Sequence, residues 1–121
     1  MPSDVEGPVR IEFTQEVKRN LRALSKKYRH IRSDIQPVIG QLESGVFLGD
    51  QVPGVKYTIF KVRIKNSDIQ KGKSSGYRLL YYLRSHKNII LITLYSKLDQ
   101  SDISARQIKS IIAEFEKLSF T

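Results

Sequence analysis

The sequence predicts an α+β fold in which a helical hairpin and a C-terminal helix pack on a small, twisted, mostly antiparallel sheet. Its 121 residues are the size of one domain, and the 40% that are apolar are enough for one core. Apolar residues recur at helical spacing toward both ends of the chain and at every second position in the middle. Because no repeat or long linker divides the chain, we expect a single domain over residues 1–121, with the order β-α-α-β-β-β-α.

A short strand and two helices are expected in the first 45 residues. The strand is indicated by the alternating apolar residues Val9, Ile11 and Phe13. Thr14 is a suitable N-cap for the first helix, whose apolar side is formed by Val17, Leu21, Leu24 and Tyr28. The second helix is expected to begin near Ser33 or Asp34. Pro37 would then lie in the first turn, where its missing N–H costs little.

Three strands and a closing helix follow, after a loop rich in glycine and proline. Strands are expected over residues 57–65, 76–84 and 89–97, because side chains alternate in the first two and the third is almost entirely apolar. An apolar strand of this kind is typical of the covered centre of a sheet. Ser104 and Gln107 have the spacing of a capping box and open the last helix, which buries Ile108, Ile111, Ile112, Phe115 and Leu118.

The positive charge is concentrated in the strand region. The formal net charge is +9, and residues 56–98 contain ten Lys or Arg and a single acid, Asp68. A surface field of one sign attracts polyanions, most often nucleic acids. The alternative is a solvated surface that only keeps the protein soluble.

Several classes of protein are excluded by composition. The chain has no cysteine and only two histidines, His30 and His86, so we expect no metal site and no cofactor. Its apolar runs are far shorter than the roughly 20 residues that cross a bilayer. Asp4 and Glu6 stand where a signal peptide would be positive. We therefore expect a cytoplasmic protein with no membrane partner.

The central stretch resembles a known family. The matching features are the Lys61-Val62-Arg63 alternation, the Ser75-Gly76-Tyr77-Arg78 turn into a strand, and Tyr81 three residues later. With the element order over residues 9–118, they resemble the RelE/ParE toxin superfamily of bacterial and archaeal toxin-antitoxin modules. The chain departs from the best-studied RelE-like ribonucleases at Leu98, where they carry a basic residue, and at Ser104, where they carry a tyrosine.

The resemblance implies a toxin of a type II module that, like its RelE-like relatives, cleaves mRNA on the ribosome without metal. In such cleavage the ribose 2′-OH attacks the phosphate, so one group must accept its proton and another must protonate the departing 5′ oxygen. Asp68 stands alone in the basic segment, so we expect no carboxylate pair for these roles and no two-metal nuclease. Cations are expected to perform the chemistry.

The expected catalytic residues are Lys61, Arg63, Arg78, Tyr95 and Lys97. Crowded positive charge favours a neutral lysine, so Lys61 is the candidate base. We expect Arg63 and Arg78 to contact phosphate, and Tyr95 and Lys97 to donate a proton or stack on a base. The candidate RNA-binding residues are Lys65, Lys71, Lys73, Tyr82 and Arg84. Tyrosines in strands more often pack in a core, however, and cations on an exposed strand often serve only solvation.

Two other functions remain open. One is a ParE-like inhibitor that binds DNA gyrase and is not a nuclease, and the other is a non-catalytic RNA-binding module. As partners, the resemblance implies the ribosome, mRNA and a cognate antitoxin, which would suit a basic toxin through acidic segments that order on binding. A toxin-antitoxin complex would contact operator DNA through the antitoxin.

Overall fold

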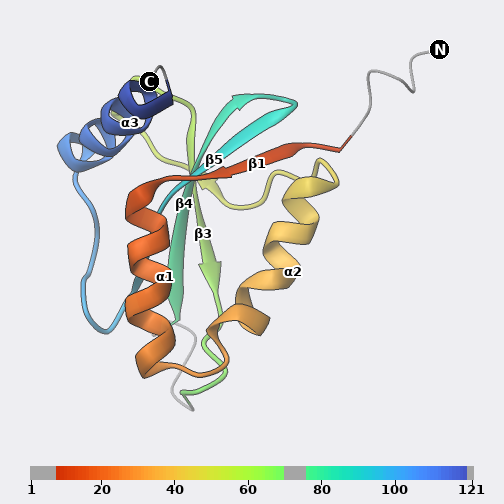
Figure 1. Cartoon of the computed structure of the whole chain (residues 1–121), viewed down its shortest axis with the longest axis vertical. Coiled ribbons are helices and arrows are strands. Elements are labelled where there is room, and N and C mark those ends of the chain that lie inside the picture. Colours follow the sequence, from red (N-terminus) through yellow and green to blue (C-terminus); the bar gives the residue numbers. More distant parts are fainter. Residues whose placement is uncertain (1–7, 70–75, 120–121) are drawn as a thin grey trace.

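The computed structural model describes residues 8–69 and 76–119, and these form one mixed α+β architecture (Figure 1). The elements in chain order are β1 (Arg10–Phe13), α1 (Gln15–Lys27), α2 (Ile31–Glu43), β2 (Asp50–Gln51), β3 (Ile59–Ile64), β4 (Tyr77–Ser85), β5 (Asn88–Ser96) and α3 (Ala105–Ser119). The α+β class is therefore confirmed. Strand β2 is an addition to the predicted order. Within the described residues, no helix combines the length and apolar character needed to cross a bilayer.

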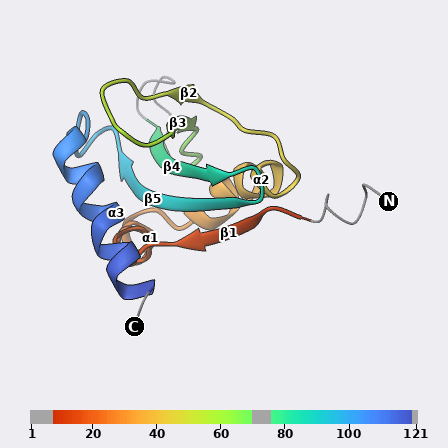
Figure 2. The ribbon, with the colours of Figure 1, turned by 90° about the horizontal axis from the view of Figure 1, so that it is seen from above.

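The sheet has five strands in the order β1-β5-β4-β3-β2, and Figure 2 shows this order from one edge to the other. Strand β1 pairs with β5 in parallel, and the other three pairings are antiparallel. Strand β5 lies between β1 and β4, which confirms the central position that its apolar sequence predicts. The two residues of β2 are too few to produce a periodic pattern, so sequence reading missed this strand.

The two faces of the sheet bury different clusters. Helices α1 and α2 cover one face, here called the hairpin face, and its core includes Val17, Leu24, Ile35, Leu42, Val62, Ile64, Tyr77, Leu79 and Tyr81. Helix α3 packs on the opposite face, here called the α3 face, and it runs beside α1 (Figure 2), with which it lines one cavity. The core there consists of Ile59, Leu80, Ile90, Ile92, Tyr95, Ile108 and Ile112. The alternation predicted for β3 and β4 is confirmed by this division.

An irregularity in β5 changes which residues face α3. Leu80 pairs with Thr93 but Tyr81 pairs with Leu91, so Ile92 is an extra residue at this point of the ladder. A β-bulge of this kind shifts the alternation by one position. As a result Tyr95 lies on the α3 face, opposite Arg78, although strict alternation from Leu91 would place it on the hairpin face.

Two predicted helix starts are confirmed. The Thr14 side chain accepts a hydrogen bond from the Val17 backbone N–H at 3.0 Å, as an N-cap does. Ser104 and Gln107 form the expected reciprocal capping box, with both backbone-to-side-chain distances at 3.1 Å.

The predicted start of the second helix is wrong, because α2 begins at Ile31. Ser33 and Asp34 resemble N-cap residues, but their side chains make other contacts. The Ser33 hydroxyl donates to a backbone carbonyl one turn earlier, and the Asp34 carboxylate accepts from the Ser67 backbone N–H. Pro37 consequently lies in the helix interior, where it removes one backbone hydrogen bond, and not in the first turn as predicted.

Candidate functional site

A row of cations crosses the α3 face from β3 to β4. Arg63 and Arg78 are direct partners in the antiparallel register, so their side chains leave the sheet on the same side. Lys61 lies two residues before Arg63 on the same face of β3. Exposure increases along this face, from buried Ile59 through partly buried Lys61 to exposed Arg63. The core around α3 thus covers the beginning of β3 and leaves its end accessible.

The row opens into a cavity of about 660 Å³. This size falls within the range of small-molecule and nucleotide sites. One wall comes from β2 and the loop after it, and another from the connection between β5 and α3. The lining includes four cations, namely Lys61, Arg63, Arg78 and Lys97. Four of the five predicted catalytic residues therefore meet at one cavity.

Asp102, from the connection before α3, holds Lys61. The Lys61 Nζ donates to Asp102 Oδ1 at 2.9 Å, and the same oxygen accepts from the backbone N–H of Ile103 at 2.8 Å. These hydrogen bonds, with that from Lys61 the larger influence, lower the pKa of Asp102. Lys61 is 30% exposed and Asp102 64%, so the pair lies at the open side of the cavity.

Arg78 and Lys97 are fixed by backbone carbonyls. Arg78 is only 5% exposed, and its guanidinium donates to the carbonyl of Tyr77 at 3.1 Å. The Lys97 Nζ donates to the carbonyl of Ser101 at 2.6 Å, which ties the end of β5 to the loop before α3. Arg63 differs, because among the described residues it has no ion-pair or hydrogen-bond partner. The cavity thus offers one uncommitted guanidinium beside a buried one.

The β2 wall approaches β3 because residue 49 is a glycine. Gly49 has a φ of +95°, and a Cβ at this position would lie 2.5 Å from the Lys61 carbonyl oxygen. Any larger residue would clash there and be strained. Asp50 follows, opposite Lys61 in the register, and it lines the cavity.

The expectation that no carboxylate pair is available is wrong. It was based on the basic segment alone, where Asp68 is the single acid. The fold adds two acids from outside that segment, since both Asp50 and Asp102 line the cavity. Local patterns could not reveal them, because Asp102 is 41 residues from Lys61 in the sequence.

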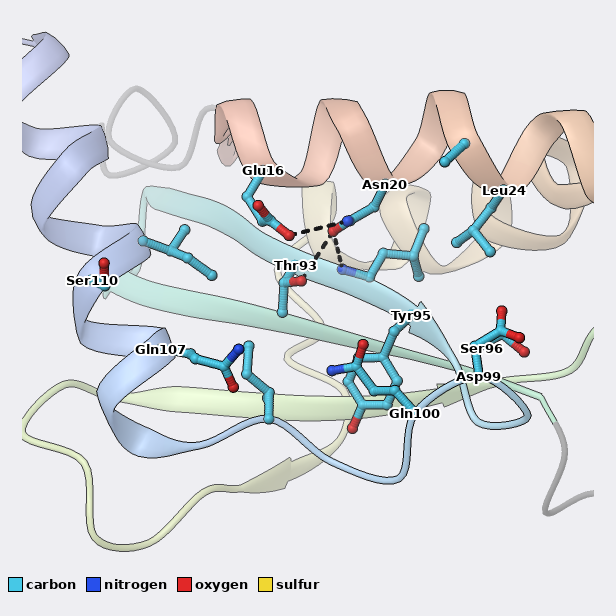
Figure 3. A pocket seen from close by; sticks show the side chains of 14 residues that line it. Glu16, Asn20, Leu24, Thr93, Tyr95, Ser96, Asp99, Gln100, Gln107 and Ser110 are labelled. Atoms are coloured by element: carbon cyan, nitrogen blue, oxygen red, sulfur yellow. Dashed lines mark hydrogen bonds between the residues drawn. The ribbon is translucent and has the colours of Figure 1, made fainter.

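Tyr95, the fifth predicted catalytic residue, lines a neighbouring cavity of about 370 Å³ (Figure 3). Tyr95 is 5% exposed, and burial, followed by the nearby Asp102 carboxylate, raises the pKa of its hydroxyl. In the same cavity the Asn20 side chain accepts from Thr93 and donates to Glu16. The charged residues in this lining are the acids Glu16 and Asp99, so the cavity lacks the cationic character of the first.

The predicted RNA-binding residues are dispersed. Lys65 is exposed just beyond the end of β3, while Arg84 is exposed near the far end of β4. Tyr82 packs against Tyr57 with ring centroids 5.2 Å apart, and burial raises its pKa. None of these three is in the lining of the cationic cavity. Lys71 and Lys73 lie outside the described residues.

Two further tyrosines of β4 belong to the core of the hairpin face. Tyr77 makes an edge contact with Tyr28, and Tyr81 stacks on Phe60 with centroids 5.4 Å apart. The Tyr81 hydroxyl donates to the Leu48 carbonyl at 2.6 Å, and burial raises the pKa of Tyr81 to about 12. Tyr77 and Tyr81 therefore pack in the core, as strand tyrosines commonly do.

His30 and Asp68 lie on another part of the surface. His30 Nδ1 is 2.6 Å from Asp68 Oδ1, and the His30 backbone N–H donates to the same carboxylate at 2.9 Å. The pair fastens the loop after β3 to the start of α2. His30 is exposed and has a structural partner.

No three His, Cys, Asp or Glu side chains of residues 8–69 and 76–119 gather closely enough to hold a metal ion. A search against models of known protein families finds no match for this chain.

Proposed function

We propose that this chain is a toxin of a type II toxin-antitoxin module, with a RelE-like fold, that cleaves ribosome-bound mRNA. The observation that carries the proposal is the direct pairing of Arg63 with Arg78 at the edge of a cavity that Lys61 and Lys97 also line. Like charges placed opposite each other in a sheet are destabilising, so their presence favours a site that binds an anion. A cavity of this size accommodates one nucleotide with its phosphates.

The proposed roles follow from the contacts. Arg63 and Arg78 stabilise the negative charge that develops on the phosphorane as the 2′ oxygen attacks. The Lys61 Nζ donates a hydrogen bond to the Asp102 carboxylate, and this engagement suits a proton donor rather than a proton acceptor. Our proposal therefore makes Lys61 the proton donor to the departing 5′ oxygen, in place of the base expected from sequence.

The same proposal includes the partners implied by the resemblance. A cationic cavity suits rRNA and mRNA, whose binding must weaken as salt rises. It equally suits an antitoxin whose acidic segment covers the cavity and silences the toxin in the cytoplasm. Contact with operator DNA would then be made by the antitoxin.

The test is induced expression of the chain followed by primer extension on cellular mRNA. We expect growth arrest with cuts inside translated codons, and the Arg63→Gln variant should cleave about 10²-fold or more slowly. Lys61→Met should suppress cleavage more than ribosome binding. Arg10→Gln is the matched control, because Arg10 is an exposed arginine of β1, at the opposite edge of the sheet from the β2 wall.

Two experimental outcomes would contradict the proposal and indicate another function. Intact messages with blocked DNA supercoiling would identify a ParE-like gyrase inhibitor. RNA binding without growth arrest would identify a non-catalytic module.

A further inference from the structure

Two carboxylates face the cationic row from opposite walls of the cavity, and their surroundings differ. Asp102 is engaged by the Lys61 ammonium and by the backbone N–H of Ile103. Asp50 is exposed and, among the described residues, makes no hydrogen bond or ion pair through its carboxylate. Enzymes assign different roles to two neighbouring titratable groups by giving them different surroundings.

The position of Asp50 brings its carboxylate to the reacting region. Asp50 pairs with Lys61 across β2 and β3, so the two side chains leave the sheet on the same side. Gly49 permits this approach, because the β2 chain runs against the backbone of Lys61. An uncommitted carboxylate therefore lies beside the lysine that Asp102 holds.

We propose that Asp50 is the general base of the cleavage proposed above and that Asp102 is a positioning residue that holds Lys61 in place as the general acid. The inference rests on the proposed function and adds to it the group that accepts the proton of the 2′-hydroxyl.

The step balances with these groups alone. The Asp50 carboxylate takes the proton of the 2′-hydroxyl, the 2′ oxygen forms a bond to phosphorus, and the bond from phosphorus to the 5′ oxygen breaks. Lys61 gives its proton to that 5′ oxygen. The products are a 2′,3′-cyclic phosphate and a 5′-hydroxyl, and transfer of the proton from Asp50 to Lys61 through water restores the site.

The cavity around Asp50 carries a surplus of positive charge. Its lining includes Lys61 and Arg63 of β3, Arg78 of β4, Lys97 at the end of β5, and the opposing acid Asp102. These cations attract the phosphate of the substrate to the cavity that Asp50 lines.

The test uses the intact chain with ribosome-bound mRNA in single-turnover cleavage. Asp50→Asn keeps the shape of the side chain and removes its basicity, so we expect cleavage about 10²- to 10⁴-fold slower, with ribosome affinity within about twofold of the unmodified chain. Asp50→Glu should recover part of the rate. Glu43→Gln removes one exposed acid at the end of α2 and should cleave normally.

The pH profile separates catalysis from folding. The unmodified chain should lose activity in acid, whereas the residual rate of Asp50→Asn should lack that decrease. Asp102→Asn should slow cleavage with ribosome affinity unchanged, because it releases Lys61 from its position, and Asp102→Glu should recover part of the rate.

Two results overturn the inference in distinguishable ways. If the unmodified chain cleaves mRNA and Asp50→Asn cleaves within about threefold of it, Asp50 is not the base and the proposed function stands. If the unmodified chain cleaves no message, the proposed function fails and the inference fails with it.

Discussion

The hairpin face and the α3 face of the sheet are built by the same strands but carry opposite kinds of surface. On β3 and β4, Val62 and Leu79 are buried under α1 and α2, whereas their neighbours Arg63 and Arg78 border a cavity. Two helices close the first face, and one helix covers part of the second. The comparison teaches that a small domain can concentrate its core on one face and keep part of the other for binding charge.

The largest difference between the faces should appear in stability. Leu79 is 1% exposed in the core of the hairpin face, so Leu79→Ala should lower the free energy of unfolding by about 2–5 kcal/mol. Exposed Arg63, on the α3 face, should tolerate Arg63→Ala within about 0.5 kcal/mol. Urea unfolding measures both. Equal losses in the two variants would mean that the cationic region is part of the core.

A glycine substitution tests how the open face is built. Gly49→Ala places a Cβ against the Lys61 carbonyl at a φ of +95°, so we expect about 1–3 kcal/mol of destabilisation. The control is Gly40→Ala, because Gly40 lies inside α2 and a Cβ added there would have nothing within 4 Å beyond its own helix backbone and chain neighbours. That variant should stabilise the fold by about 0.5–1 kcal/mol. Changes of the same sign in both variants would contradict the close approach of the β2 wall.

The N-caps of α1 and α3 provide a test, with a smaller expected effect, of the difference in stability between the hairpin face and the α3 face. Thr14 caps α1 and is buried, since its hydroxyl also donates to the Ile92 carbonyl at 2.7 Å, so Thr14→Ala should cost about 2 kcal/mol. Ser104 caps α3 at an exposed position, and Ser104→Ala should cost about 1 kcal/mol. Thermal unfolding gives the order of the two. The reverse order would show α3 to be the more firmly held.

The smallest expected effect is on how the melting temperature changes in acid. The pKa of Asp68 is lowered from the usual 3.8 by His30, and that of Asp102 is lowered by Lys61. A carboxyl whose pKa is lower in the folded state stabilises the fold above its unfolded pKa. This contribution is lost as the pH falls through the folded value. Melting temperatures between pH 6 and pH 2 should therefore decrease slightly less in Asp68→Asn and Asp102→Asn than in the unmodified chain. If the melting temperatures of the variants and of the unmodified chain decreased equally, these ion pairs would not contribute to the stability of either face.

The regular elements could be predicted from sequence because their periods are local. The alternation of Lys61, Val62 and Arg63 placed side chains on the correct faces, and the apolar run of β5 predicted its central position. The cavity itself could be predicted only in part. Asp50 and Asp102 come from a two-residue strand and a loop, and neither segment is long enough to show a period. The start of α2 was missed because Asp34 contacts Ser67, a distant residue that no local pattern contains.

The parallel pairing of β1 with β5 has a consequence for the newly made chain. Thr14, which follows β1, bonds to Ile92 of β5 across 78 residues of sequence. At the usual pace of translation those residues take roughly 4 to 16 seconds to synthesise. The first strand must therefore wait for its neighbour while α1 and α2 are already available to form. The sheet can assemble only after β5 has emerged, and a contact so distant in sequence is of the kind that slows folding.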